Sequence, residues 1–137
     1  MIAQQPITEL IPHRAPFIMV DVLTAVSEEK FESDFQVLEN NVLVENGHLS
    51  ASGLIENVAQ TSAAGFGITE VSQNGQPTLG YIGSITKVEI FELPAVGETV
   101  HTIVTPTHRL GNIVMVSGTS FVAQRQLMVC EMKIVIK

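Results

Sequence analysis

The 137-residue sequence predicts an α+β domain in which one long helix packs against an antiparallel sheet. Residues 50–69 carry apolar side chains at helical spacing on one broad stripe. The segments before and after them alternate apolar and polar residues, which is typical of strands. A chain of this length builds one hydrophobic core, so residues 1–137 are expected to form a single domain.

Before the long helix, the pattern predicts a short helical turn and two strands. Residues 8–11 form the turn, which Pro12 stops, and residues 17–26 form the first strand. Residues 31–37 form the second strand, after a turn at 27–30. The apolar patch at 42–44 is ambiguous. The second strand is expected to bury one face, made of Phe31, Ser33, Phe35 and Val37.

The helix at 50–69 is expected to start at a serine cap, Ser50 or Ser52. Its second half is rich in small residues, which let a helix lie close to a sheet or leave room for a ligand chain. A polar loop at 72–77 follows. The last four strands, with the first one interrupted at Gly83, are predicted at 81–91, 98–105, 112–123 and 127–136.

Charge and composition exclude several classes of function. The net charge of −7 disfavours nucleic acid and anionic membranes as partners, because both require a basic surface. Charged residues make up only 15% of the chain, which favours burial of one face in a homodimer. No apolar run is long enough to span a bilayer and no signal peptide is evident, so a cytoplasmic location is expected. Cys130 is expected to be a buried thiol.

Two residues in the first half of the chain suit an elimination reaction. His48 lies in the polar loop Asn46-Gly47-His48-Leu49, and Glu56 follows eight residues later inside the apolar helix. An elimination needs one group to take a proton and another to supply one, and an imidazole with a carboxyl in an apolar wall can do both. Each also has a structural interpretation, as a loop histidine bonded to backbone and as an ordinary first-turn glutamate.

Four motifs, in order along the chain, resemble those of the hot-dog-fold (3R)-hydroxyacyl-[acyl-carrier-protein] dehydratases. The resemblance begins with Ile11-Pro12-His13-Arg14-Ala15-Pro16-Phe17-Ile18-Met19-Val20-Asp21. It continues with Asn46-Gly47-His48-Leu49 and with Glu56-Asn57-Val58-Ala59-Gln60. It ends with the segment from Tyr81 to Phe91 and the turn Pro94-Ala95-Val96-Gly97-Glu98.

This resemblance implies a hot-dog fold, in which a six-stranded antiparallel sheet wraps around a central helix. It implies an edge-to-edge dimer with active sites at the interface, where His48 of one chain meets Glu56 of the other. The implied reaction is loss of water from a β-hydroxyacyl thioester, carried on acyl carrier protein or coenzyme A, to give the trans-2-enoyl thioester. No cofactor is expected, and the sequence leaves assembly beyond a dimer open.

Three further residues are candidates for the site. Gly53 lies near the helix N-terminus, where free backbone N–H groups could polarise the thioester carbonyl. Gln60 lies one turn after Glu56 and could orient it, or could donate to a nearby loop. Gly83 could allow close backbone approach, although a strand bulge explains it equally well. His13 is expected to be structural, and no spacing suits a metal.

The segment from His48 to Glu56 departs from the family pattern. It is shorter than in the family and lacks proline, and Leu49 and Ser50 replace the usual Phe-Pro. This departure suits a divergent branch, such as one serving a specialised polyketide-type pathway. It also motivates two alternatives, namely an acyl thioesterase in which Glu56 activates water, and a catalytically silent acyl-binding or partner subunit.

Overall fold

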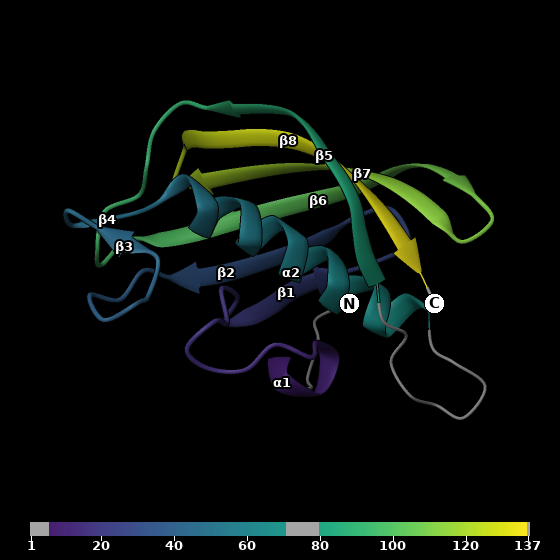
Figure 1. The fold of residues 1–137 in the computed structure, drawn as a ribbon, viewed down its shortest axis with the longest axis horizontal. Helices are drawn as coiled ribbons and strands as arrows, with labels where there is room; N and C mark the ends of the chain where they lie inside the picture. The colour runs from purple at the N-terminus through teal and green to yellow at the C-terminus, as the bar shows by residue number, and fades with distance from the viewer. Residues whose placement is uncertain (1–5, 71–79, 137) are drawn as a thin grey trace.

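The computed structural model describes residues 6–70 and 80–136. Within these residues, the elements follow the order helix, two strands, a short hairpin, a long helix and four strands (Figure 1). Their bounds are α1 Ile7–Leu10, β1 Val22–Val26, β2 Phe31–Gln36, β3 Val44–Glu45, β4 His48–Leu49, α2 Ala51–Thr69, β5 Gly80–Ile90, β6 Thr99–Leu110, β7 Ile113–Val122 and β8 Arg125–Ile136.

One antiparallel sheet contains all the long strands, in the order β1-β2-β6-β7-β8-β5. Figure 1 shows α2 lying along this sheet, with β1 and β5 at its opposite margins. The predicted α+β architecture, with a six-stranded sheet around one central helix, is therefore confirmed. No helix in the described residues is long and apolar enough to cross a membrane.

Helix α2 lies close to the sheet because glycines remove side-chain volume at two contacts. A Cβ placed on Gly65 would lie 2.2 Å from the ring of Phe31 on β2. A Cβ on Gly118 of β7 would lie 2.5 Å from a methyl group of Val58 on the helix. Phe31 also packs edge-to-face against Phe66, with ring centroids 5.0 Å apart. The small residues of the helix thus serve close packing, one of the two roles predicted for them.

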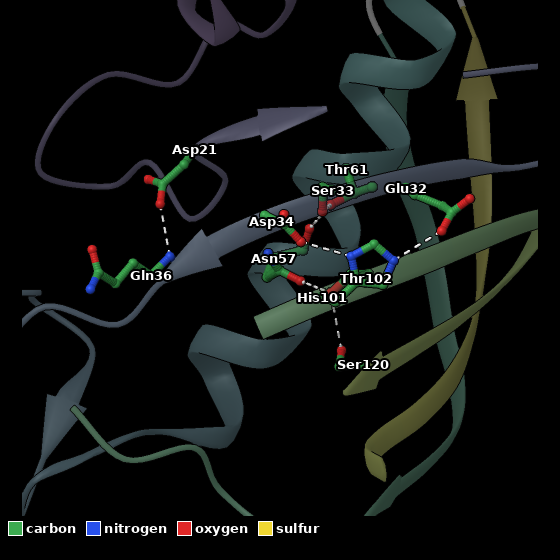
Figure 2. A network of polar contacts seen from close by, with 10 residues as sticks. All are labelled: Asp21, Glu32, Ser33, Asp34, Gln36, Asn57, Thr61, His101, Thr102 and Ser120. Carbon is green, nitrogen blue, oxygen red and sulfur yellow. Dashed lines mark hydrogen bonds and ion pairs between the residues drawn. The ribbon is translucent and has the colours of Figure 1, made fainter. Parts of the chain in front are cut away.

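Buried polar side chains also connect the helix to the sheet (Figure 2). Thr102 of β6 donates to the side-chain oxygen of Asn57 and lies within reach of the Ser120 hydroxyl. The hydroxyls of Ser33 and Thr61 lie 2.7 Å apart. All five side chains are fully buried, and unpaired polar atoms are costly there, so these bonds fix the rotation of α2 against β2 and β6.

Several predicted boundaries need correction. The first strand covers only Val22–Val26, and residues 17–21 are not in a strand. The ambiguous patch at 42–44 leads into the small β3–β4 hairpin, which was not predicted. Strand β6 extends to Leu110, beyond the expected end at residue 105. The last turn lies at Ala123 and Gln124, since β8 already begins at Arg125. The loop predicted at 72–77 falls outside the described residues.

Other expectations hold. Ser50 caps α2, and its hydroxyl accepts a hydrogen bond from the backbone N–H of Gly53. The face predicted for the second strand is buried as expected. Cys130 is a buried free thiol, and burial raises its pKa to about 11, so it is a poor nucleophile.

Candidate active site

Glu56 lies in the second turn of α2, and its side chain is 40% exposed. The apolar stripe of the helix turns Leu54 and Val58 into the core and leaves Glu56 at the margin of that stripe. The carboxyl group is therefore anchored to a rigid element but still accessible to a substrate.

Gln60 holds Glu56 from one turn further along the helix. Its Nε2 donates to Glu56 Oε1 at 3.0 Å and to the carbonyl oxygen of Phe17 at 2.8 Å. Its Oε1 accepts from the backbone N–H of Met19 at 2.7 Å. Both roles considered for Gln60 are thus present at once, because it contacts the glutamate and also the loop.

Asn57 completes the attachment of the segment that precedes β1. Its Nδ2 donates to the carbonyl oxygen of Met19 at 2.6 Å. Asn57 and Gln60 therefore provide hydrogen-bond partners for the backbone of residues 17–19. In a strand, these backbone groups would bond to a neighbouring strand instead. This explains why the first strand begins only at Val22, and it places the preceding loop against α2.

That loop brings His13 next to Glu56. His13 Nε2 lies 3.4 Å from Glu56 Oε1, and the His13 side chain is 32% exposed. This contact was missed from the sequence, which predicts a structural role for His13. The available signal was the Pro12-His13-Arg14 motif itself, but only the tertiary path of the loop brings it to the helix.

His48 lies at the other end of the short segment, on the exposed side of the β3–β4 hairpin. Asn46 and Gly47 form its turn with φ angles of 54° and 77°, the left-handed region that Asn and Gly tolerate. His48 Nδ1 lies 3.1 Å from the carbonyl oxygen of Asn46, and His48 also forms a β-bridge with Ala95. The backbone bond expected for a structural loop histidine is thus present, and the rest of the ring stays accessible.

The hairpin borders an open hollow of about 550 Å³. Carboxylates are prominent around it, because Glu45 and Glu92 line it and Glu98 interacts with His48. The Ala95 backbone N–H and the Arg125 guanidinium lower the pKa of Glu98, although burial opposes them. The full lining is Glu45, Asn46, His48, Ser50, Ala51, Glu92 and Leu93.

Within one chain, the described residues show no hydrogen bond or ion pair between His48 and Glu56. The carboxyl of Glu56 contacts His13 and Gln60, whereas the ring of His48 contacts Asn46. A single chain therefore does not assemble the two predicted catalytic side chains into a bonded pair.

The two candidate glycines have structural explanations. The N–H of Gly53 donates to Ser50 Oγ at 3.3 Å, so it already serves as the cap donor. A Cβ at Gly53 would lie 2.4 Å from the Leu49 side chain, so glycine is needed for close packing there. Gly83 lies at a register shift in β5, where its nearest side chain is that of Lys133. This is the bulge that was considered for it.

Four of the seven basic side chains form ion pairs, and the described residues offer no metal site. Ion pairs join Lys87 to Glu131 at 3.4 Å and Arg109 to Glu70 at 2.6 Å, while Arg125 pairs with Glu92 and Glu98. In the described part of the chain, no group of three or more His, Cys, Asp or Glu side chains could hold a metal ion.

Comparison with known proteins gives one family match and several structural matches. The family model "ApeP-like: ApeP dehydratase" matches residues 5–134. The 3-hydroxyacyl-[acyl-carrier-protein] dehydratase FabZ of Methylobacterium nodulans is 33% identical over 101 residues, which cover 69% of this chain and 63% of that protein. The chain thus matches less than two thirds of the length of this relative.

Among solved structures, the dehydratase heterocomplex ApeI:P from Xenorhabdus doucetiae matches with a TM-score of 0.83 at 17% identity, covering 98% of this chain and 93% of that chain. Protein PH1136 from Pyrococcus horikoshii matches with a TM-score of 0.73 at 12% identity, covering 98% and 95%. The acetyl-CoA-bound smu.793 from Streptococcus mutans matches with a TM-score of 0.69 at 9% identity, covering 84% and 86%. At these identities the structures establish the shared fold alone.

Proposed function

Because the chain belongs to the ApeP-like dehydratase family, we propose that it dehydrates a β-hydroxyacyl thioester to the trans-2-enoyl thioester. The observation that carries the proposal is the setting of Glu56, whose carboxyl is fixed to Gln60 on a rigid helix but remains 40% exposed. A general acid needs this combination of fixed geometry and access to the substrate. We assign the reaction to the cytoplasm, as the sequence predicts.

In the proposed reaction, the neutral imidazole of His48 takes the α-proton, which the adjacent thioester acidifies. Glu56 gives its proton to the β-hydroxyl group. The C–O bond then breaks, its electron pair leaves with water, and the electrons of the former C–H bond form the double bond. Both side chains act by proton transfer alone, so the step needs no cofactor.

We further propose that the active form is a homodimer, because one chain leaves His48 and Glu56 in separate contacts. Strand β5 is the proposed interface, since among residues 6–70 and 80–136 it pairs with β8 alone and forms one margin of the sheet. Long apolar edge strands tend to pair with another chain. The exposed apolar side chains of β5 and the residue after it are Tyr81, Ile82, Ile85, Val88, Ile90 and Phe91.

The carrier of the acyl group is the next part of the proposal. The FabZ relative is named for acyl carrier protein, and smu.793 binds acetyl-CoA, so both thioesters are candidates. Carrier proteins are acidic, and this chain is acidic too, with a net charge of −7 and four of its seven basic residues in ion pairs with its own carboxylates. Charge complementarity sets mainly the association rate, so we propose either thioester as a substrate.

A second candidate function is that of a silent partner subunit. It is favoured by the shortened His48–Glu56 segment together with the structural match to a dehydratase heterocomplex. Such a subunit would bind a related active chain and have no turnover alone. An acyl thioesterase, in which Glu56 activates water against the carbonyl, is the alternative chemistry on this fold.

Hydration of a short trans-2-enoyl thioester, followed as loss of enoyl absorbance, tests these proposals. The substrate is offered on acyl carrier protein and on coenzyme A. We expect turnover by the wild type and a loss of about 100-fold or more in His48→Ala and in Glu56→Gln. The matched controls are His108→Ala and Glu39→Gln, which make the same changes at exposed residues that have no role in the proposed reaction.

The products decide between the alternatives. An enoyl or hydroxyacyl thioester with its thioester bond intact supports the dehydratase. Release of free thiol that depends on Glu56 but not on His48 identifies a thioesterase. Absence of turnover on both carriers contradicts the dehydratase and leaves the partner subunit.

A further inference from the structure

The contact between His13 and Glu56 has no role in the reaction proposed above. His13 Nε2 lies 3.4 Å from Glu56 Oε1, and both residues belong to the same chain. The contact therefore exists before any partner binds. A distance of this length is common for catalytic hydrogen bonds in the absence of substrate, where they often tighten only in the complex.

Hydrogen bonds fix the backbone of the loop before and after His13. The Arg14 guanidinium donates to the carbonyl oxygens of Ile11 at 3.0 Å and His13 at 2.7 Å. The Phe17 N–H donates to the carbonyl oxygen of Arg14 at 2.9 Å, and the Phe17 carbonyl accepts from Gln60. The loop is thus connected to α2 through the same glutamine that holds Glu56.

The ring itself has one polar partner in the described residues. His13 Nδ1 is buried and has no hydrogen-bond partner there, so Nε2 makes the polar contact, with Glu56. A ring proton on Nδ1 would be a buried donor without an acceptor, whereas a proton on Nε2 has the Glu56 carboxyl oxygen as its acceptor. The surroundings thus favour the tautomer with its proton on Nε2, directed at the carboxyl.

Both donors reach the same carboxyl oxygen. Gln60 Nε2 and His13 Nε2 each contact Glu56 Oε1, and Oε2 has no hydrogen bond or ion pair within the described residues. An oxygen that accepts two N–H groups is a poor site for a proton, so the acidic proton belongs on Oε2. The bonds to Oε1 then fix the orientation of the carboxyl group, while Oε2 carries the proton that is transferred.

We propose that His13 is a positioning residue that directs the acidic proton of Glu56 onto Oε2, facing the substrate. The inference rests on the proposed dehydratase function and deepens it. In the reaction, the Oε2 proton passes to the β-oxygen, the C–O bond breaks and water leaves. The two N–H groups on Oε1 then stabilise the carboxylate that remains, and solvent restores its proton while His48 releases the α-proton.

Two substitutions of His13 separate positioning from a structural role. Leucine removes the N–H, whereas glutamine can place an amide N–H near the position of Nε2. We expect His13→Leu to lower kcat for the enoyl thioester about tenfold or more, with KM changed less than about twofold. We expect His13→Gln to recover kcat to within about threefold of the wild type. The control is His108→Leu, at an exposed histidine on β6, which should change neither value.

A spectroscopic readout makes the test independent of activity. The ring ¹⁵N shifts of His13 report which nitrogen carries the proton. We expect the Nε2–H tautomer in the wild type and a change in the Nε2 shift in Glu56→Gln, with the His108 signals unchanged. If the wild type had no enoyl hydratase activity but His13 responded to Glu56→Gln, the dehydratase proposal would fail and the coupling would stand.

Other results would overturn the inference. Equal losses of kcat in His13→Leu and His13→Gln would indicate a packing role. If His13→Leu kept the wild-type kcat, His13 would not act on Glu56 in the reaction. If the ¹⁵N shifts of His13 were the same in the wild type and in Glu56→Gln, the two side chains would not be coupled. Thermal unfolding of each variant identifies a variant that fails to fold, and the ¹⁵N measurement on Glu56→Gln keeps the test decisive in that case.

Discussion

At the scale of single residues, a histidine between two carboxylates couples stability to pH. His101 on β6 contacts Asp34 through Nδ1 at 2.7 Å and Glu32 through Nε2 at 2.9 Å (Figure 2). A neutral ring cannot donate from both nitrogens, so this geometry favours the imidazolium ion. Partial burial acts to lower the pKa of His101, but the hydrogen bonds to Asp34 and Glu32 outweigh it and raise the pKa. The hydrogen bond from His101, followed by that from Lys30, lowers the pKa of Glu32.

These opposite shifts define a pH window of maximal stability. A raised histidine pKa contributes stability that is complete below the ordinary value of 6.5 and is lost as pH rises through the folded-state pKa. A lowered glutamate pKa contributes stability that is present above the ordinary value of 4.5 and is lost as pH falls. The interaction of the three side chains should therefore be strongest between these two values and weaken on the alkaline side.

We predict that His101→Asn lowers the free energy of unfolding more at pH 5.5 than at pH 8.5. The difference should be about 1 kcal/mol or less, because all three side chains are partly exposed and solvent screens them. Urea unfolding at the two pH values measures it, with His108→Asn as the control. An equal loss at both values would mean that the charge on His101 contributes nothing to stability.

Residue-level predictions from sequence succeeded where the partners lie on one helix. Glu56 and Gln60 are four residues apart, a spacing that places them on the same face, and the bond between them is confirmed at 3.0 Å. The contact of His13 with Glu56 could not be predicted in this way. It depends on a loop whose backbone bonds to Asn57 and Gln60, and periodicity carries no information about such side-chain-to-backbone contacts.

At the scale of elements, the contact between α2 and β2 depends on the absence of a side chain at Gly65. We predict that Gly65→Ala destabilises the protein by about 1–3 kcal/mol, because its Cβ would lie 2.2 Å from the buried Phe31 ring. This occurs although alanine favours a helix by about 1 kcal/mol over glycine. The control is Gly83→Ala, whose Cβ meets the flexible end of Lys133 at 3.3 Å. Chemical denaturation measures both, and a stabilised Gly65→Ala variant would contradict the packing.

The existence of each element, more than its exact boundaries, was predictable in proportion to the length of the pattern. The long helix and the four C-terminal strands extend over ten or more residues each, so their periodicity is clear. Strands β3 and β4 have two residues each, too few to show alternation. The Asn46-Gly47 pair that forms their turn is the signal that could have found the hairpin.

At the scale of the whole molecule, the low charged fraction of 15% predicts an apolar surface, and its burial in a homodimer stays a prediction. Strand β5 provides such a surface, since five of its eleven residues are large, apolar and at least 38% exposed. The sequence could not indicate which strand would form the margin of the sheet, because strand order follows from tertiary packing. In the proposed homodimer, each active site needs residues from both chains, so the catalytic unit is the dimer.

Mixed dimers test this whole-molecule proposal. We predict that dimers with His48→Ala in one chain and Glu56→Gln in the other, isolated through two different tags, recover about half of the wild-type hydration rate. One of their two sites would then combine an intact His48 with an intact Glu56, and the other would lack both. Dimers pairing His108→Ala with Glu39→Gln serve as the control and should keep the full rate. If each site lay within one chain, every mixed dimer would be inactive, because both chains would carry a damaged site. A mixed dimer without activity, in a preparation whose control is fully active, would therefore place the reaction within a single chain and remove the reason for a shared site.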